Sequence, residues 1–69
     1  MLTPELDSPS RAIEIGYDTG RGLRGHGAQL QDLNFNIDVA RGGYPRSPYY
    51  DFWLEGFRAG YLGEPKPES

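Results

Sequence analysis

The segment that comes nearest to a chemical motif is a run of glycine and arginine in the first half of the chain. Gly20-Arg21-Gly22-Leu23-Arg24-Gly25 fits the pattern G-x-G-x-x-G. That pattern cradles a pyrophosphate where a strand turns into a helix within a βαβ unit. Here a predicted helix precedes the pattern and a predicted loop follows it. The sequence therefore favours a flexible basic loop, and we expect no cofactor.

Arginines are the side chains in this sequence that are best suited to binding. Six of the seven basic residues are arginine, and a guanidinium makes planar, two-point contacts with a carboxylate or a phosphate. Arg21, Arg24 and Arg41 lie in glycine-rich stretches, where backbone amides can add to such contacts. The alternative is that these arginines are solvated and have no ligand.

No catalytic or metal-binding constellation is recognisable in the sequence. His26 is the only histidine, it is flanked by glycines, and the chain has no cysteine. A general acid or base needs a positioned partner, and a zinc site needs several ligands. Neither a G-x-S-x-G elbow nor a phosphate-binding loop is present. We expect no enzymatic activity, no metal, and an exposed loop position for His26.

Length and charge narrow the class of protein. A chain of 69 residues allows one small domain, and such a chain buries only about 60% of its unfolded surface. The net charge of −3 argues against free DNA as a partner, because non-specific affinity for nucleic acid comes from Lys and Arg. The absence of cysteine, of a long apolar stretch and of a signal-peptide pattern predicts a cytoplasmic protein without a membrane segment. We expect a flexible acidic arm (1–8), a single domain (9–63) and a flexible tail (64–69).

A first helix is predicted near the N-terminus. Ser8 followed by Pro9 is typical of an N-cap and a first helical position, and it predicts a helix from Pro9 to about Gly20 or Gly22. Gly16 and Gly20 are four residues apart, so they share a face of this helix.

A second helix is predicted between Ser47-Pro48, which repeats the cap pattern, and Gly63, which supplies a stop. Gly56 and Gly60 again stand four residues apart. Each interior glycine costs about 0.5–1 kcal/mol relative to alanine, so two such pairs predict that the two helices approach each other closely. The apolar stripe of the second helix comprises Tyr50, Trp53, Leu54, Phe57 and Tyr61.

The connection between these helices contains an alternating segment. Leu33, Phe35, Ile37 and Val39 alternate with polar residues, which predicts a half-buried β-strand. A lone strand must pair with a second copy, giving a homodimer, or with the sheet edge of another protein. The alternative is an irregular loop whose apolar residues cap the core. The predicted fold is mainly α, a short two-helix hairpin with one added β-strand in the connection, dimeric where the strand pairs with itself.

Seven of the nine aromatic residues fall within residues 44–61. Trp53 and Phe57 are expected to form the core against Ile13 and Tyr17 of the first helix. Tyr49 and Phe52 are expected to stay partly exposed as interface anchors, because aromatic residues and arginine dominate binding energy at interfaces.

The two predicted helices carry Gly16-Tyr17-x-x-Gly20 and Trp53-Leu54-x-Gly56-Phe57-Arg58-x-Gly60. This pattern resembles the ribosome modulation factor family and its small phage- and plasmid-borne relatives, over roughly residues 12–22 and 44–60. The resemblance implies a short helical hairpin that binds the small ribosomal subunit and helps to silence ribosomes. It implies structural roles for Gly16, Tyr17, Gly20, Trp53, Gly56, Phe57 and Gly60.

Two departures from the family leave a second hypothesis open. The ribosome-binding members are strongly basic, whereas this chain is acidic, and the link between its helices is longer by residues 30–39. The alternative is a phage-encoded inhibitor that binds and blocks a host protein, for example a defence or nucleic-acid-binding protein. The residues expected to contact the partner, whether ribosome or host protein, are Arg21, Arg24, Phe35, Ile37, Arg41, Tyr49 and Phe52.

Overall fold

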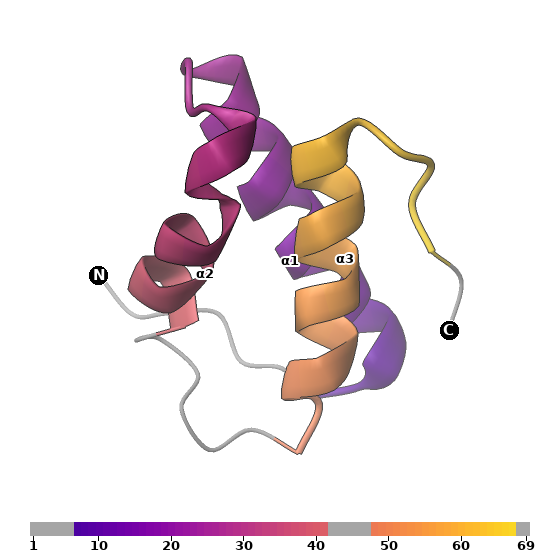
Figure 1. Ribbon diagram of the computed structural model, residues 1–69. Helices are drawn as coiled ribbons and strands as arrows, with labels where there is room; N and C mark the ends of the chain where they lie inside the picture. The colour runs from indigo at the N-terminus through magenta and orange to yellow at the C-terminus, as the bar shows by residue number, and fades with distance from the viewer. Residues whose placement is uncertain (1–6, 42–47, 68–69) are drawn as a thin grey trace.

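The computed structural model describes residues 7–41 and 48–67 of the chain (Figure 1). These residues form three α-helices, α1 (Pro9–Gly25), α2 (Leu33–Arg41) and α3 (Tyr50–Leu62), with a short 3-10 helix, η1 (Leu30–Asp32), immediately before α2. The mainly α fold class is confirmed. None of the helices in the described part of the chain has the length and hydrophobicity needed to cross a bilayer.

Helix α1 begins where the sequence predicts and ends later. The Ser8 hydroxyl accepts a hydrogen bond of 3.1 Å from the backbone N–H of Arg11, which confirms the predicted N-cap. The predicted loop is wrong for residues 21–25, which continue the helix to Gly25. Gly22 and Gly25 face open space and do not interrupt the backbone hydrogen bonds, so the helix ends only at His26, before the left-handed Gly27.

Helices α1 and α3 pack backbone against backbone at the predicted glycines. A Cβ atom at Gly16 would lie 2.9 Å from the carbonyl carbon of Trp53 and would overlap its oxygen. A Cβ atom at Gly56 would lie 2.9 Å from the carbonyl carbon of Ile13. No side chain fits at either position, which confirms that these glycines permit the close helix approach.

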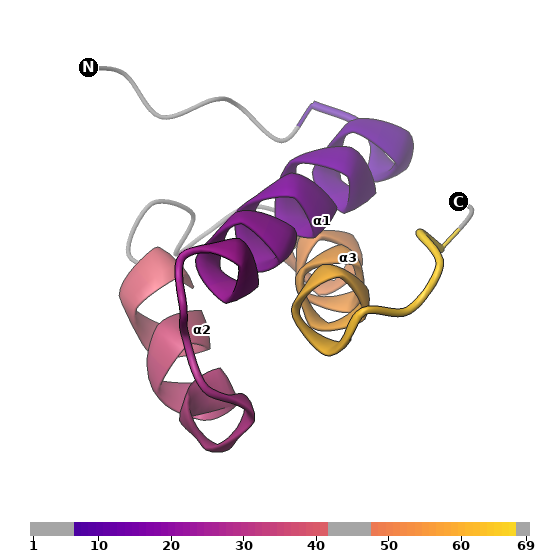
Figure 2. The same cartoon turned by 90° about the horizontal axis from the view of Figure 1, so that it is seen from above.

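The same contact repeats one turn further along both helices. Gly20 faces the backbone of Phe57, and Gly60 faces the backbone of Tyr17. Because the contacts advance in the same sense on both helices, α1 and α3 run in the same direction. The two helices are thus parallel and joined through α2, whereas a simple two-helix hairpin would make them antiparallel. Helix α2 follows α1 in the sequence and returns the chain to the end where α3 begins. It lies to one side of the crossing helices α1 and α3 (Figures 1 and 2).

The core lies between these helices and is mainly aromatic. Trp53 and Phe57 expose no surface, and Tyr61 is buried beside them. Their rings follow one another along α3, with centroids 5.1 Å apart for Trp53 and Phe57 and 5.8 Å apart for Phe57 and Tyr61. Ala12 and Ile13 are the buried apolar side chains of α1. The predicted burial of Trp53, Phe57 and Ile13 is confirmed, whereas Tyr17, also predicted for the core, is only half-buried.

The predicted β-strand is wrong, because its residues form α2. Residues two apart differ by about 200° around a helix and residues four apart by about 40°. The alternation therefore places Leu33 and Ile37 on one face, packed against the core, and Phe35 and Val39 on the other. A helix pairs its own backbone groups, whereas a lone strand leaves an open edge. The strand-mediated dimer and the strand pairing with another protein lose their basis with the strand.

Hydrogen bonds from Tyr61 attach α2 to α3. The Tyr61 hydroxyl donates to the backbone carbonyl of Gln29 and accepts a bond of 3.1 Å from the Asn36 side-chain amide. The same amide donates to the carbonyl of Asp32 at 3.0 Å. The buried hydroxyl thereby fixes the segment that leads into α2.

Helix α3 ends at the predicted stop. Gly63 has a φ of 75°, in the left-handed region that glycine favours. The Tyr17 hydroxyl then donates a bond of 3.0 Å to the Glu64 carbonyl, which joins the following residues to α1. At its other end α3 starts at Tyr50, two residues after Pro48, and the predicted cap Ser47 lies outside the described residues.

Candidate functional site

The residues predicted to bind a partner do not gather at one place. Arg21 and Arg24 lie on the last turns of α1, and Tyr49 and Phe52 lie at the start of α3. The remaining three, Phe35, Ile37 and Arg41, are on α2. These residues therefore lie at three separate places on the molecule.

The first surface is a hollow at the C-terminal ends of α1 and α3, which lie together because the two helices run in the same direction. It has a volume of about 460 Å³. We call it the arginine hollow. It is lined by Arg21, Arg24, Gly25, Leu30, Gly60, Tyr61, Leu62 and Gly63.

The two arginines of the hollow differ in how they are held. The Arg24 guanidinium lies 5.7 Å from the centroid of the Tyr61 ring and donates to the carbonyl of Ala28. The Arg21 side chain forms no ion pair or hydrogen bond among the described residues. Both side chains are exposed, and part of their positive charge offsets the negative ends of the two helix dipoles.

Apolar surface completes the arginine hollow. Leu30 is 55% exposed and Leu62 is 43% exposed, and no carboxylate side chain is among the lining residues. The hollow thus presents two guanidiniums beside two leucines. Such a surface suits an anionic group that is attached to an apolar one.

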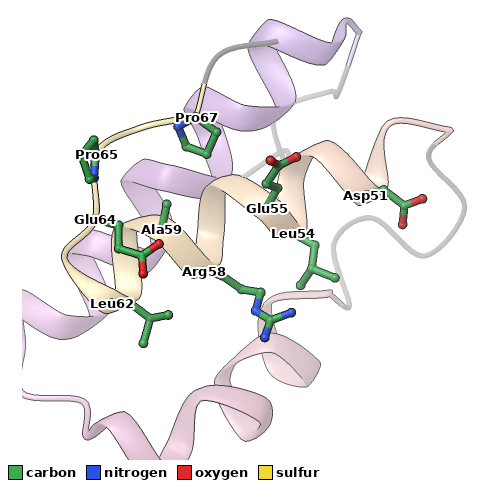
Figure 3. Close-up of a pocket in the computed structure, with 9 residues that line it drawn as sticks. All are labelled: Asp51, Leu54, Glu55, Arg58, Ala59, Leu62, Glu64, Pro65 and Pro67. Atoms are coloured by element: carbon green, nitrogen blue, oxygen red, sulfur yellow. The ribbon is translucent and has the colours of Figure 1, made fainter.

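The second surface is a groove of about 540 Å³ along the outer side of α3 (Figure 3). Figure 3 shows Leu54, Arg58 and Leu62 leaving α3 on one side, with Pro65 and Pro67 on the opposite side. Asp51, Glu55, Ala59 and Glu64 complete its lining. Because the described lining contains no serine, cysteine or histidine, it has no hydroxyl or thiol nucleophile activated by an imidazole. The described residues also contain no group of carboxylate and imidazole side chains placed to hold a metal.

The third surface is the side of α2 that faces away from the core. Phe35 is 67% exposed and Val39 is 64% exposed, and as residues four apart they share one face of the helix. Sequence reasoning selected Phe35 but missed Val39, Leu30 and Leu62. The four-residue spacing of Phe35 and Val39 was a usable signal, but only if the segment was interpreted as a helix.

The other predicted contact residues have intramolecular partners. Ile37 and Tyr49 are half-buried and pack against the core. The Arg41 guanidinium lies 5.6 Å from the centroid of the Tyr50 ring. Phe52 is 36% exposed, so its side chain is partly exposed, as expected. His26 is exposed in the turn after α1, as expected.

Tyr50 occupies the junction of α2 and α3, and its surroundings change its acidity. Burial raises the pKa of the Tyr50 hydroxyl above its ordinary value, while the charge of Arg41 lowers that pKa and the charges of Asp38 and Asp51 raise it. The Tyr50 ring also stacks on Trp53, with centroids 5.4 Å apart. Arg41 and Tyr50 therefore contribute to the contact between the two helices.

Comparison with known proteins adds no further constraint. No family model, no curated protein and no solved structure matches the chain. The function must therefore be argued from the three surfaces and from the resemblance carried by the two glycine-containing helices.

Proposed function

We propose that this chain is a small non-enzymatic binding protein that regulates translation by binding the ribosome in the cytoplasm. The observation that carries the proposal is the contact between the two segments that resemble the ribosome modulation factor family. Gly16 of the first segment faces the backbone of Trp53 in the second, and Gly60 of the second faces Tyr17 of the first. The resemblance implies one structural unit built from both segments, and this contact supports that implication.

The arginine hollow is the surface that we assign to the ribosome. Ribosomal RNA presents phosphates, and a guanidinium contacts a phosphate through two parallel hydrogen bonds. Arg21 forms no ion pair with a described residue, and Arg24 is oriented by Tyr61 and Ala28. Two such arginines give a local positive surface on a chain whose net charge is −3.

Sedimentation with purified ribosomes tests this assignment. The wild-type chain should co-sediment with the small subunit, and the double variant Arg21→Glu, Arg24→Glu should lose most of that binding. The matched control is Arg11→Glu, Arg58→Glu, which makes the same change in net charge at two other exposed arginines. Equal loss in both variants would indicate non-specific charge attraction. Failure of the wild-type chain to co-sediment would refute the proposal.

The second candidate function is inhibition of a host protein. It is favoured by the exposure of Phe35 and Val39 on α2, because paired apolar side chains at the surface are typical of protein contacts. Affinity purification with the chain as bait, followed by binding of the purified partner, separates the two candidates. A protein partner whose binding survives Arg21→Glu, Arg24→Glu, together with no ribosome association, would support this second function over the first.

A further inference from the structure

We propose that the outer face of α2 docks a basic amphipathic segment of a partner protein. Phe35 and Val39 are its apolar anchors, and the carboxylates of Asp32 and Asp38 bind the positive side chains of the partner.

The first step concerns the apolar residues of α2. Leu33, Ile37 and Ala40 pack against the core, whereas Phe35 and Val39 are exposed on the other side. A surface helix normally has one apolar face, whereas α2 has a second apolar pair on its outer side, separated from the core-facing residues by polar positions. The fold itself does not cover this pair.

The second step concerns the charges around that pair. Asp38 follows Phe35 by three residues on α2, and Asp32 precedes it by three at the end of η1. Both aspartates are exposed, and neither forms an ion pair with a described residue. The nearest cation in sequence, Arg41, lies over the Tyr50 ring instead. Among the described residues, the apolar pair therefore has negative charge at its margins and no positive side chain paired with it there.

These charges select the occupant. A second copy of the chain, docked through the same face, would bring two Asp32 and two Asp38 carboxylates around one small contact, where like charges repel. A helical segment with apolar residues at four-residue spacing and Lys or Arg beside them complements both the anchors and the carboxylates.

The proposal rests on the proposed function only in so far as both treat the chain as a binding protein, and its test uses no ribosomes. The probe is a fluorescently labelled designed helical peptide with leucines on one face and lysines on either side of them. Its matched control peptide has glutamates in place of the lysines. Binding to the full chain is measured by fluorescence anisotropy at physiological ionic strength.

The lysine peptide should bind, and the glutamate peptide should not. The double variant Phe35→Ser, Val39→Ser should weaken binding about tenfold or more, since anchor residues dominate binding energy. The variant Asp32→Asn, Asp38→Asn should weaken it several-fold. The control Glu14→Gln, Asp18→Asn removes the same charge from α1 and should leave the affinity unchanged. Circular dichroism checks that each variant keeps its helices.

Three results would overturn the proposal. Equal binding of both peptides, or equal weakening by the α1 control and by the aspartate variant, would show that the face has no selectivity. Absence of binding at high peptide concentration would show that it is not a docking surface for such a segment. A concentration-dependent dimer that Phe35→Ser, Val39→Ser dissociates would identify a second copy as the occupant.

Discussion

Replacing Gly16 with alanine should destabilise the fold, whereas the same replacement at Gly22 in the same helix should stabilise it. A Cβ atom at Gly16 would lie 2.9 Å from the carbonyl carbon of Trp53, whereas carbon atoms in contact stay about 3.5–4.0 Å apart. The helices must then separate locally by at least about 0.6–1.1 Å, and by more to clear the Trp53 carbonyl oxygen. Such a gap loses at least a quarter to a half of the dispersion energy of each contact affected.

The net effect of these terms differs in sign between the two sites. Alanine gains about 0.5–1 kcal/mol over glycine inside a helix. At Gly16 the loss of packing outweighs this gain, because overpacked contacts typically cost about 1–3 kcal/mol. At Gly22 no atom lies within 4 Å of the added Cβ, so only the gain is left.

Thermal unfolding followed by circular dichroism measures both effects. In a domain of this size, 1 kcal/mol corresponds to about 4–8 °C in Tm. Gly16→Ala should therefore lower Tm by several degrees or more, and Gly22→Ala should raise it by about 2–8 °C. If Gly16→Ala melted at or above the wild-type temperature, α1 and α3 would not pack through this residue. A fall in Tm for Gly22→Ala comparable with that for Gly16→Ala would show that glycine is required there for another reason.

Three further changes test other parts of the fold. Tyr61→Phe removes the hydroxyl that bonds to Asn36 and Gln29, so it should lower the free energy of unfolding in urea by about 1–3 kcal/mol. Trp53→Ala removes a side chain with no exposed surface and should cost about 3–5 kcal/mol, enough to leave much of the chain unfolded by circular dichroism. Because the pKa of Tyr50 is raised in the folded chain, the folded state holds the proton more tightly than the unfolded state does. The stability linked to this group is present below about pH 10 and is lost as pH rises through the folded pKa. A pH series of urea unfolding should show this loss in the wild type but a weaker one in Tyr50→Phe.

Features governed by neighbouring residues could be predicted from the sequence. Ser8 and Gly63 act within one turn of their own positions, and both the N-cap and the C-terminal stop are confirmed. The glycine pairs were also predictable, because each unfavourable helical glycine needs a compensating contact. Their partners across the interface followed from the matching four-residue spacing on both helices.

Other features depended on contacts that the sequence does not display. Four alternating apolar residues fit a strand with one apolar face and also a helix with two apolar faces. In this fold, packing of Leu33 and Ile37 against the core favours the helix. Asn36, which the alternation assigned to the polar face of a strand, contacts Tyr61 twenty-five residues away. The arginine hollow was half predicted, since Arg21 and Arg24 were selected but Leu30 and Leu62 were not. Leu62 lies beside the arginines because α2 returns the chain, which places the C-terminal ends of α1 and α3 together. Leu30 follows the turn after α1.

The two proposed binding surfaces depend on different contacts, so they can be lost separately. The arginine hollow needs the register of α1 and α3, which is fixed where Gly20 and Gly60 meet the opposing backbones. The outer face of α2 needs the attachment of α2, for which Tyr61 supplies the hydrogen bonds at its leading end. Tyr61→Phe keeps the ring beside Arg24 but loosens α2, so we expect it to weaken the proposed peptide binding more than the proposed ribosome binding. Separating α1 from α3 by Gly16→Ala acts on the packing that both surfaces share, and should weaken both.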